Sequence, residues 1–107
     1  MMALNRFNLI YAPQVKSHLK TIEKKYHSLI RRRIEVELRF EPHVVTRNRK
    51  PLKRPVELGA DWEIRFGPDN RFRVFYAVDF EKWQVLVLAI GVKQGNKLVI
   101  GAEEVEL

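Results

Sequence analysis

Apolar positions repeat at two different spacings along this chain, and the change of spacing divides it into a helical half and a sheet half. Between about residues 13 and 41 apolar side chains recur every three or four positions, as on one face of an α-helix. From residue 62 to residue 100 they alternate with polar side chains or form continuous runs, as in β-strands. The pattern predicts an α+β domain in which two helices pack against a sheet.

The helical half opens with a short β-type run at residues 7–11, followed by Pro13, which suits the first turn of a helix. The apolar stripe predicts a first helix over about residues 13–26. Ser28 can cap a second helix, which carries a broad apolar face and ends at Pro42. Because the link between the two is very short, we expect an antiparallel helical hairpin.

The sheet half contains three or four strands. Trp62, Ile64 and Phe66 alternate with Glu63 and Arg65, and the sequence Gly-Pro-Asp-Asn at residues 67–70 predicts a turn into an alternating strand at residues 72–78. The run at residues 85–90 is apolar on both faces and predicts the central strand, and residues 98–100 predict a last strand. Residues 43–60 are expected to be a loop, and the acidic end at residues 103–107 is either an edge strand or a loose tail. The prediction is a mostly antiparallel sheet of three to four strands, preceded by an N-terminal strand and the helical hairpin.

The turn at residues 67–70 determines which side chains face each other across the first hairpin. When the apolar residues of both strands face the core, Ile64 lies opposite Val74, and Arg65 therefore lies opposite Arg73 on the outer face. Like charges directly opposite each other are destabilising, by about 0.2–1 kcal/mol. The arrangement therefore needs an explanation.

Two interpretations of this arginine pair remain open. In the first, an anion sits over Arg65 and Arg73, and Lys93, just beyond the central strand, lies near the same place. In the second, Glu63 and Asp61 neutralise the arginines on a solvated face.

Charge is unevenly distributed along the chain. Residues 1–54 carry 14 Lys and Arg against 4 Asp and Glu, whereas residues 55–107 carry 6 against 9, so the halves have net charges of +10 and −3 and the total is +7. Five cations lie within residues 47–54: Arg47, Arg49, Lys50, Lys53 and Arg54. Such a basic segment either binds phosphate or is simply solvated.

Composition narrows the remaining functions. A chain of 107 residues with 46% hydrophobic residues is expected to form one domain, spanning residues 1–107. With no cysteine and only three histidines, which lack metal-ligand spacing, we expect neither a metal nor another cofactor. The absence of a signal-peptide core or a run of about 20 apolar residues predicts a cytoplasmic protein that does not bind membranes.

Several motifs resemble those of the RelE/ParE superfamily, the toxins of type II toxin–antitoxin systems. They are L-I-R-R-R-I at residues 29–34, K-P-L-K at residues 50–53, W-E-I-R-F at residues 62–66, R-V-F-Y-A-V-D at residues 73–79 and V-L-A-I-G-V-K at residues 87–93. Together they cover nearly the whole chain in the order that the superfamily has.

The resemblance implies a toxin held inactive by a cognate antitoxin protein, with operator DNA as a further partner of the complex. RelE-like members cleave mRNA on the ribosome by attack of the ribose 2′-hydroxyl, which would make the protein an endoribonuclease. By position, Arg73, Arg65 and Lys93 would be the catalytic residues, and the segment comprising Arg49, Lys50, Lys53 and Arg54 would bind the RNA backbone. The alternatives are a gyrase inhibitor of ParE type and a catalytically degenerate protein that binds only its antitoxin and DNA.

The chain departs from the RelE-type site at three points. Glu63 stands two residues before the strand arginine, where a basic residue is usual, and residues 98–100 are Leu, Val and Ile where some members have a tyrosine. The histidine found near the end of the apolar strand in some relatives is also missing. Without such an acid or base, electrostatic stabilisation of the phosphate is the main contribution left for catalysis.

Overall fold

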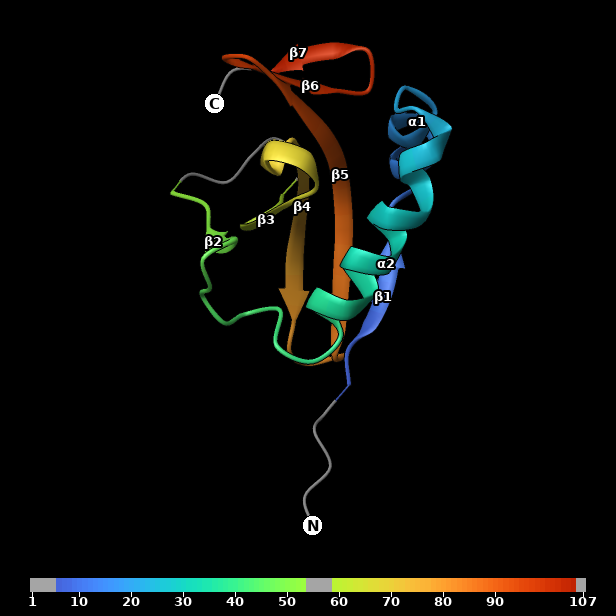
Figure 1. Cartoon of the computed structure of the whole chain (residues 1–107). Coiled ribbons are helices and arrows are strands. Elements are labelled where there is room, and N and C mark those ends of the chain that lie inside the picture. The colour runs from blue at the N-terminus through green and yellow to red at the C-terminus, as the bar shows by residue number, and fades with distance from the viewer. Residues whose placement is uncertain (1–5, 54–58, 106–107) are drawn as a thin grey trace.

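One twisted sheet with both helices on the same face makes up the domain (Figure 1). The computed structural model describes residues 6–53 and 59–105. The elements, in chain order, are β1 (Asn8–Tyr11), α1 (Pro13–Lys20), the 3-10 helix η1 (Lys24–Tyr26), α2 (His27–Leu38), β2 (Arg49–Pro51), β3 (Trp62–Phe66), the 3-10 helix η2 (Pro68–Asn70), β4 (Phe72–Asp79), β5 (Gln84–Gln94), β6 (Lys97–Ile100) and β7 (Glu103–Val105). The predicted α+β class and the order of the main elements are confirmed.

Both helices are shorter than the apolar stripe predicted. α1 ends at Lys20, where the backbone N–H of Thr21 donates back to the helix, and η1 then leads into α2. The stripe nevertheless continues into the core, because Ile22 is buried in the bend after α1 and Tyr26 packs against the core from η1. α2 ends at Leu38 rather than at the proline that was expected to stop it. No helix in the described residues is long and apolar enough to cross a membrane.

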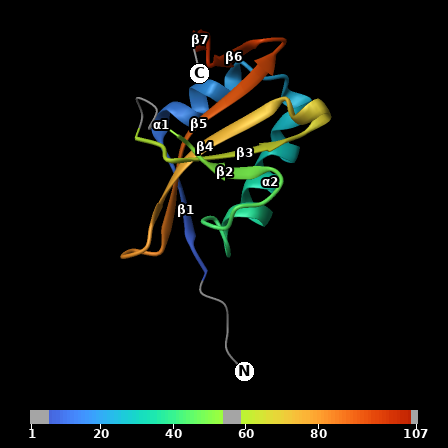
Figure 2. The same ribbon diagram turned by 90° about the vertical axis from the view of Figure 1, so that its left-hand side faces the viewer.

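Among the described residues the sheet has seven strands, more than the N-terminal strand and the three or four others that were predicted. Its order is β2-β3-β4-β5-β6-β7, and β1 pairs with β5 in parallel (Figure 2). β5 is central as predicted, because it pairs with β4, β6 and β1. β2 and β7 were missed or left open because each has only three residues, too few for an alternating pattern to be recognised.

The predicted register of the first hairpin is confirmed. Ile64 lies opposite Val74, and Arg65 lies opposite Arg73. The apolar residues of both strands pack under the helices, whereas a smaller cluster of Ala60, Phe75, Ala89 and Leu98 lies apart from this main core. The two arginines therefore share the sheet face that points away from the helices.

Candidate phosphate-binding site

Arg65 and Arg73 converge on a single carboxylate oxygen. The Nε of Arg65 donates to Oε1 of Glu63 at 3.0 Å, and Nη1 of Arg73 donates to the same oxygen at 2.9 Å. Glu63 reaches both because it lies two residues before Arg65 on β3, and side chains two apart on a strand share a face. These three residues, which we call the β3–β4 triad, carry a net charge of +1.

Arg65 is the most exposed member of the β3–β4 triad. The side chains of Glu63 and Arg73 are each 5% exposed, whereas that of Arg65 is 34% exposed. Arg73 is held further by its Nε, which donates to the backbone carbonyl of Asn70 at 3.1 Å. Of the two interpretations left open by the sequence, neutralisation by Glu63 describes this geometry, although Arg73 is buried rather than solvated. Asp61 forms no ion pair with the described residues.

A cleft of about 570 Å³ lies beside the β3–β4 triad, where η2 meets the end of β5. Its lining residues are Pro68, Asp69, Arg71, Arg73, Lys93, Gln94 and Gly95. Arg73 thus contacts Glu63 on one side and borders the cleft on another, whereas Arg65 is not part of the lining. Lys93, predicted to lie near the arginine pair, does border the cleft with Arg73.

Arg71 is a cleft residue that sequence reasoning did not select. The backbone N–H of Lys93 donates to the carbonyl of Arg71 at 2.7 Å, which holds the two cationic residues close together. The Arg71 guanidinium also lies 5.9 Å from the centre of the Tyr26 ring and 5.9 Å from that of Phe72, within the range of cation–π attraction. Arg73 lies opposite Gly91 in the pairing of β4 with β5, so continuing that register by two residues places Arg71 opposite Lys93.

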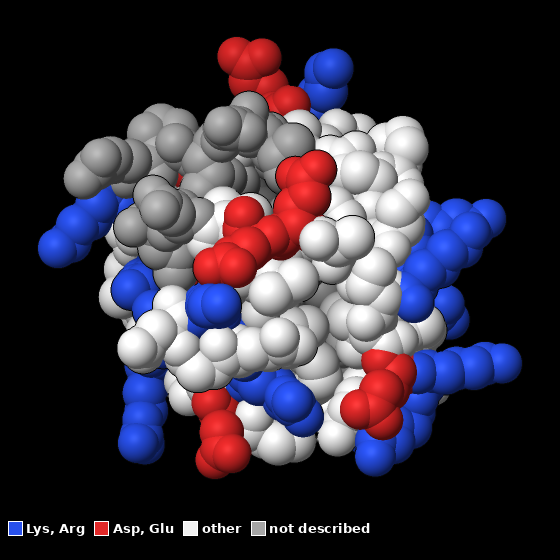
Figure 3. Space-filling view, turned by 90° about the horizontal axis from the view of Figure 1, so that it is seen from above, with Lys and Arg blue, Asp and Glu red and all other residues white. Residues whose placement is uncertain are grey.

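The cleft is cationic, although the surrounding surface is mixed. Its lining carries three positive side chains against the single carboxylate of Asp69. Seen from the end of the sheet near β6 and β7, Lys and Arg side chains project at the outline on both sides, with acidic side chains among them (Figure 3). The positive charge of the cleft therefore comes from its own lining residues, because the surface around it is not uniformly basic.

The basic segment at residues 47–54 does not form one surface. Lys50 lies opposite Glu63 in the pairing of β2 with β3, so its exposed side chain shares the face of the β3–β4 triad. Arg49 lies opposite Ile64 and therefore faces the other way. Lys53 is exposed, and Arg54 lies outside the described residues.

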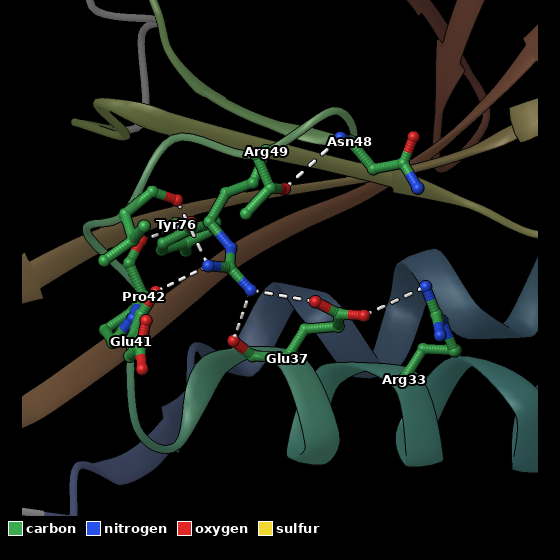
Figure 4. A network of polar contacts seen from close by, with 9 residues as sticks. Arg33, Glu37, Glu41, Pro42, Asn48, Arg49 and Tyr76 are labelled. Carbon is green, nitrogen blue, oxygen red and sulfur yellow. Dashed lines mark hydrogen bonds and ion pairs between the residues drawn. The ribbon is translucent and has the colours of Figure 1, made fainter.

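Arg49 is buried in a polar network at the end of α2 (Figure 4). Its side chain is 5% exposed, and Nη1 donates to the backbone carbonyls of Glu41 at 2.6 Å and Val44 at 3.1 Å. Nη2 donates to both the carbonyl and the carboxylate of Glu37, at 2.8 Å each, and that carboxylate also pairs with Arg33 at 3.0 Å. An arginine engaged in this way caps the carbonyl end of the helix and the loop that follows, so the expected RNA contact by Arg49 does not fit its position.

Acid and base candidates are scarce at the cleft. Tyr76 is buried, and its hydroxyl donates to the carbonyl of Pro42 at 2.7 Å on the helical side of the sheet. Burial raises the pKa of Tyr76 well above its ordinary value, so it is a poor proton donor as well as a remote one. No group of three or more potential metal ligands occurs within residues 6–53 and 59–105. The cleft is therefore suited to electrostatic binding of an anion.

Two comparisons with known proteins found a match, one to a protein family and one to a solved structure with a similar fold. A family model described as "Phage derived protein Gp49-like (DUF891)" matches residues 17–100. The fold is similar to that of a chain in the toxin–antitoxin complex RelBE2 from Mycobacterium tuberculosis, with a TM-score of 0.63 and 21% identity, covering 82% of this chain and 99% of that chain. At that identity the likeness concerns the fold alone. No match was found among curated proteins.

Proposed function

Because the chain belongs to the phage-derived Gp49-like family, a RelE-like toxin family, we propose that it is a toxin whose cleft binds RNA phosphate and supports cleavage of mRNA on the ribosome. The observation that carries the proposal is the meeting of Arg71, Arg73 and Lys93 at one cleft. Guanidinium groups bind phosphate oxygens through paired N–H donors, and an ammonium group adds a mobile point charge. A protein antitoxin is the partner that this function requires.

In the proposed reaction the ribose 2′-oxygen forms a bond to phosphorus while the bond from phosphorus to the 5′-oxygen breaks. The 2′-hydroxyl loses its proton to water, and the leaving 5′-oxygen takes a proton from Lys93 or from water. Arg71 and Arg73 stabilise the extra negative charge on the phosphate in the transition state. A positioned base contributes about 10²–10⁴ in rate, and in this scheme water takes the proton of the 2′-hydroxyl, so we expect slow turnover.

RNA binding should respond to salt in proportion to the number of cations in the cleft. Three phosphate contacts predict a slope of about −2 for log affinity against log salt with a single strand, so a fourfold rise in salt weakens binding about 20-fold. Substituting one of the three cations should lower the magnitude of that slope by about 0.7.

Primer extension on cellular mRNA after induction tests the cleavage step. We expect cut messages with the wild type and fewer with Arg71→Ala or Lys93→Ala. Lys82→Ala is the matched control, because it removes an exposed charge from the turn between β4 and β5. Intact messages with the wild type, or an equal loss of cleavage with Lys82→Ala, would contradict the proposal.

The β3–β4 triad favours a second candidate, a toxin that inhibits DNA gyrase without cutting RNA. Glu63 ties the two strand arginines to the fold, and removes part of the charge that a nuclease would use. This candidate predicts induction of the DNA-damage response with intact mRNA. A harmless parent protein with neither response would instead indicate a degenerate member that binds an antitoxin and operator DNA.

A further inference from the structure

We infer that the position between Arg65 and Arg73 is an oxyanion-binding site that Glu63 already fills. Two guanidinium groups on directly opposed residues converge on one oxygen, at 3.0 and 2.9 Å. A phosphate or sulfate ion offers several oxygens of the same kind and accepts paired N–H donors from both groups. The anion site itself does not depend on the proposed function, but its expected effect on RNA binding does.

The pairing of strands explains why an anion stabilises this position. Opposed residues on antiparallel strands have Cα atoms only about 4.5–5.5 Å apart, so Arg65 and Arg73 leave the sheet close together, and Arg73 is buried away from water that would screen its charge. Lys50 adds a third positive charge on the same face, because it lies opposite Glu63 on β2. Without a negative charge among them, the positively charged side chains on this face would repel one another.

The site is closed to external anions in the wild type. Glu63 is attached to the same strand as Arg65, so its local concentration greatly exceeds that of free phosphate in solution. Its side chain and that of Arg73 are almost completely buried, whereas Arg65 leaves one side facing solvent. Removal of the carboxylate would therefore leave a cationic position with an entrance beside Arg65.

Removal of the carboxylate of Glu63 should turn this position into a working anion site. The test variant is Glu63→Ala in the full chain, because alanine removes the carboxylate and leaves room between the two arginines. Glu104→Ala is the matched control, since it makes the same change of side chain and net charge at a residue whose side chain is 58% exposed and lies 3.7 Å from Lys97. The probe is inorganic sulfate, and the measurement is the melting temperature against sulfate concentration at constant ionic strength.

We expect the apparent affinity for sulfate to rise at least about tenfold in Glu63→Ala relative to both the wild type and Glu104→Ala, as one gained charge-assisted hydrogen bond implies. Equal sulfate responses in Glu63→Ala and Glu104→Ala would overturn the inference. Glu63→Asp provides a second variant: it keeps the charge but is one methylene shorter, so it should release one arginine and give a smaller gain. If neither variant folds without sulfate, folding on its addition supports the inference, and failure at every concentration overturns it.

Binding of a single-stranded RNA oligonucleotide to the same variants separates this inference from the proposed function. Stronger sulfate binding with unchanged RNA binding would support the anion site and count against RNA as its ligand. Stronger binding of both would support the two proposals together. An unchanged sulfate response would reject the anion site whether or not the wild type cleaves mRNA.

Discussion

Replacement of Arg49 by alanine should destabilise the protein, although the residue lies in the most basic segment of the sequence. The substitution removes four hydrogen bonds, which join β2 to the end of α2 and to the loop at residues 41–44. Three backbone carbonyls each lose a donor, and the carboxylate of Glu37 keeps only its ion pair with Arg33. The effect should therefore appear in folding rather than in RNA binding.

The expected loss in the free energy of unfolding is about 2–4 kcal/mol. Breaking a fully buried ion pair by removing one partner costs about 3–5 kcal/mol. Here the cost is smaller, because Glu37 is 24% exposed and remains paired, and because the buried Nε of Arg49 has no hydrogen-bond partner among the described residues. In a domain of this size, the loss corresponds to a fall of about 10 °C or more in melting temperature.

Urea unfolding followed by circular dichroism measures the change. Arg49→Lys should lose an intermediate amount, since one ammonium group keeps the charge but cannot serve all four acceptors. Lys50→Ala is the control, because this neighbour on β2 is exposed and its loss should change stability by less than about 0.5 kcal/mol.

The structural role of Arg49 would be refuted if Arg49→Ala were within about 1 kcal/mol of the wild type, a typical effect of any point mutation. A fall in RNA affinity without a loss of stability would instead restore the role expected from the sequence. A loss in both would require the RNA measurement to be repeated well below the melting temperature of the variant.

Three further substitutions test other parts of the fold. Tyr76→Phe removes a buried hydroxyl that donates to a backbone carbonyl, and should cost about 1–2 kcal/mol in urea unfolding. Because burial raises the pKa of Tyr76, wild-type stability should fall as pH rises above about 10, and the variant should lose less, as measured by alkaline unfolding. Burial lowers the pKa of His18, whose Nδ1 accepts from the backbone N–H of Ile90, so the contribution of this histidine is present above about pH 6.5 and is lost as pH falls. His18→Gln should flatten stability between about pH 7.5 and 5.5, and a profile unchanged from the wild type would contradict that assignment. Gly67→Ala should cost about 2–4 kcal/mol by thermal unfolding, because φ is +84° and the new methyl group would overlap the ring of Phe72; a neutral effect would show that the turn can rearrange.

Local pattern was enough to predict the positions of the main elements and one register. The alternation on both sides of residues 67–70 places Arg65 opposite Arg73, because a strand has a period of two and the turn sets the pairing. The apolar stripe predicted the helical surface that is buried, though not where α1 gives way to η1. These features depend on residues that are close together in the sequence, so they can be predicted from local pattern alone.

The surroundings of each charge were decided by the tertiary structure. Arg49 and Lys50 are adjacent and equally basic, yet β2 turns one toward α2 and the other toward the β3–β4 triad. The parallel pairing of β1 with β5 and the meeting of Arg71 with Lys93 likewise join segments far apart in the chain. Composition counts such charges, but whether a guanidinium faces a helix end, a carboxylate or an open cleft depends on which distant strand lies beside it.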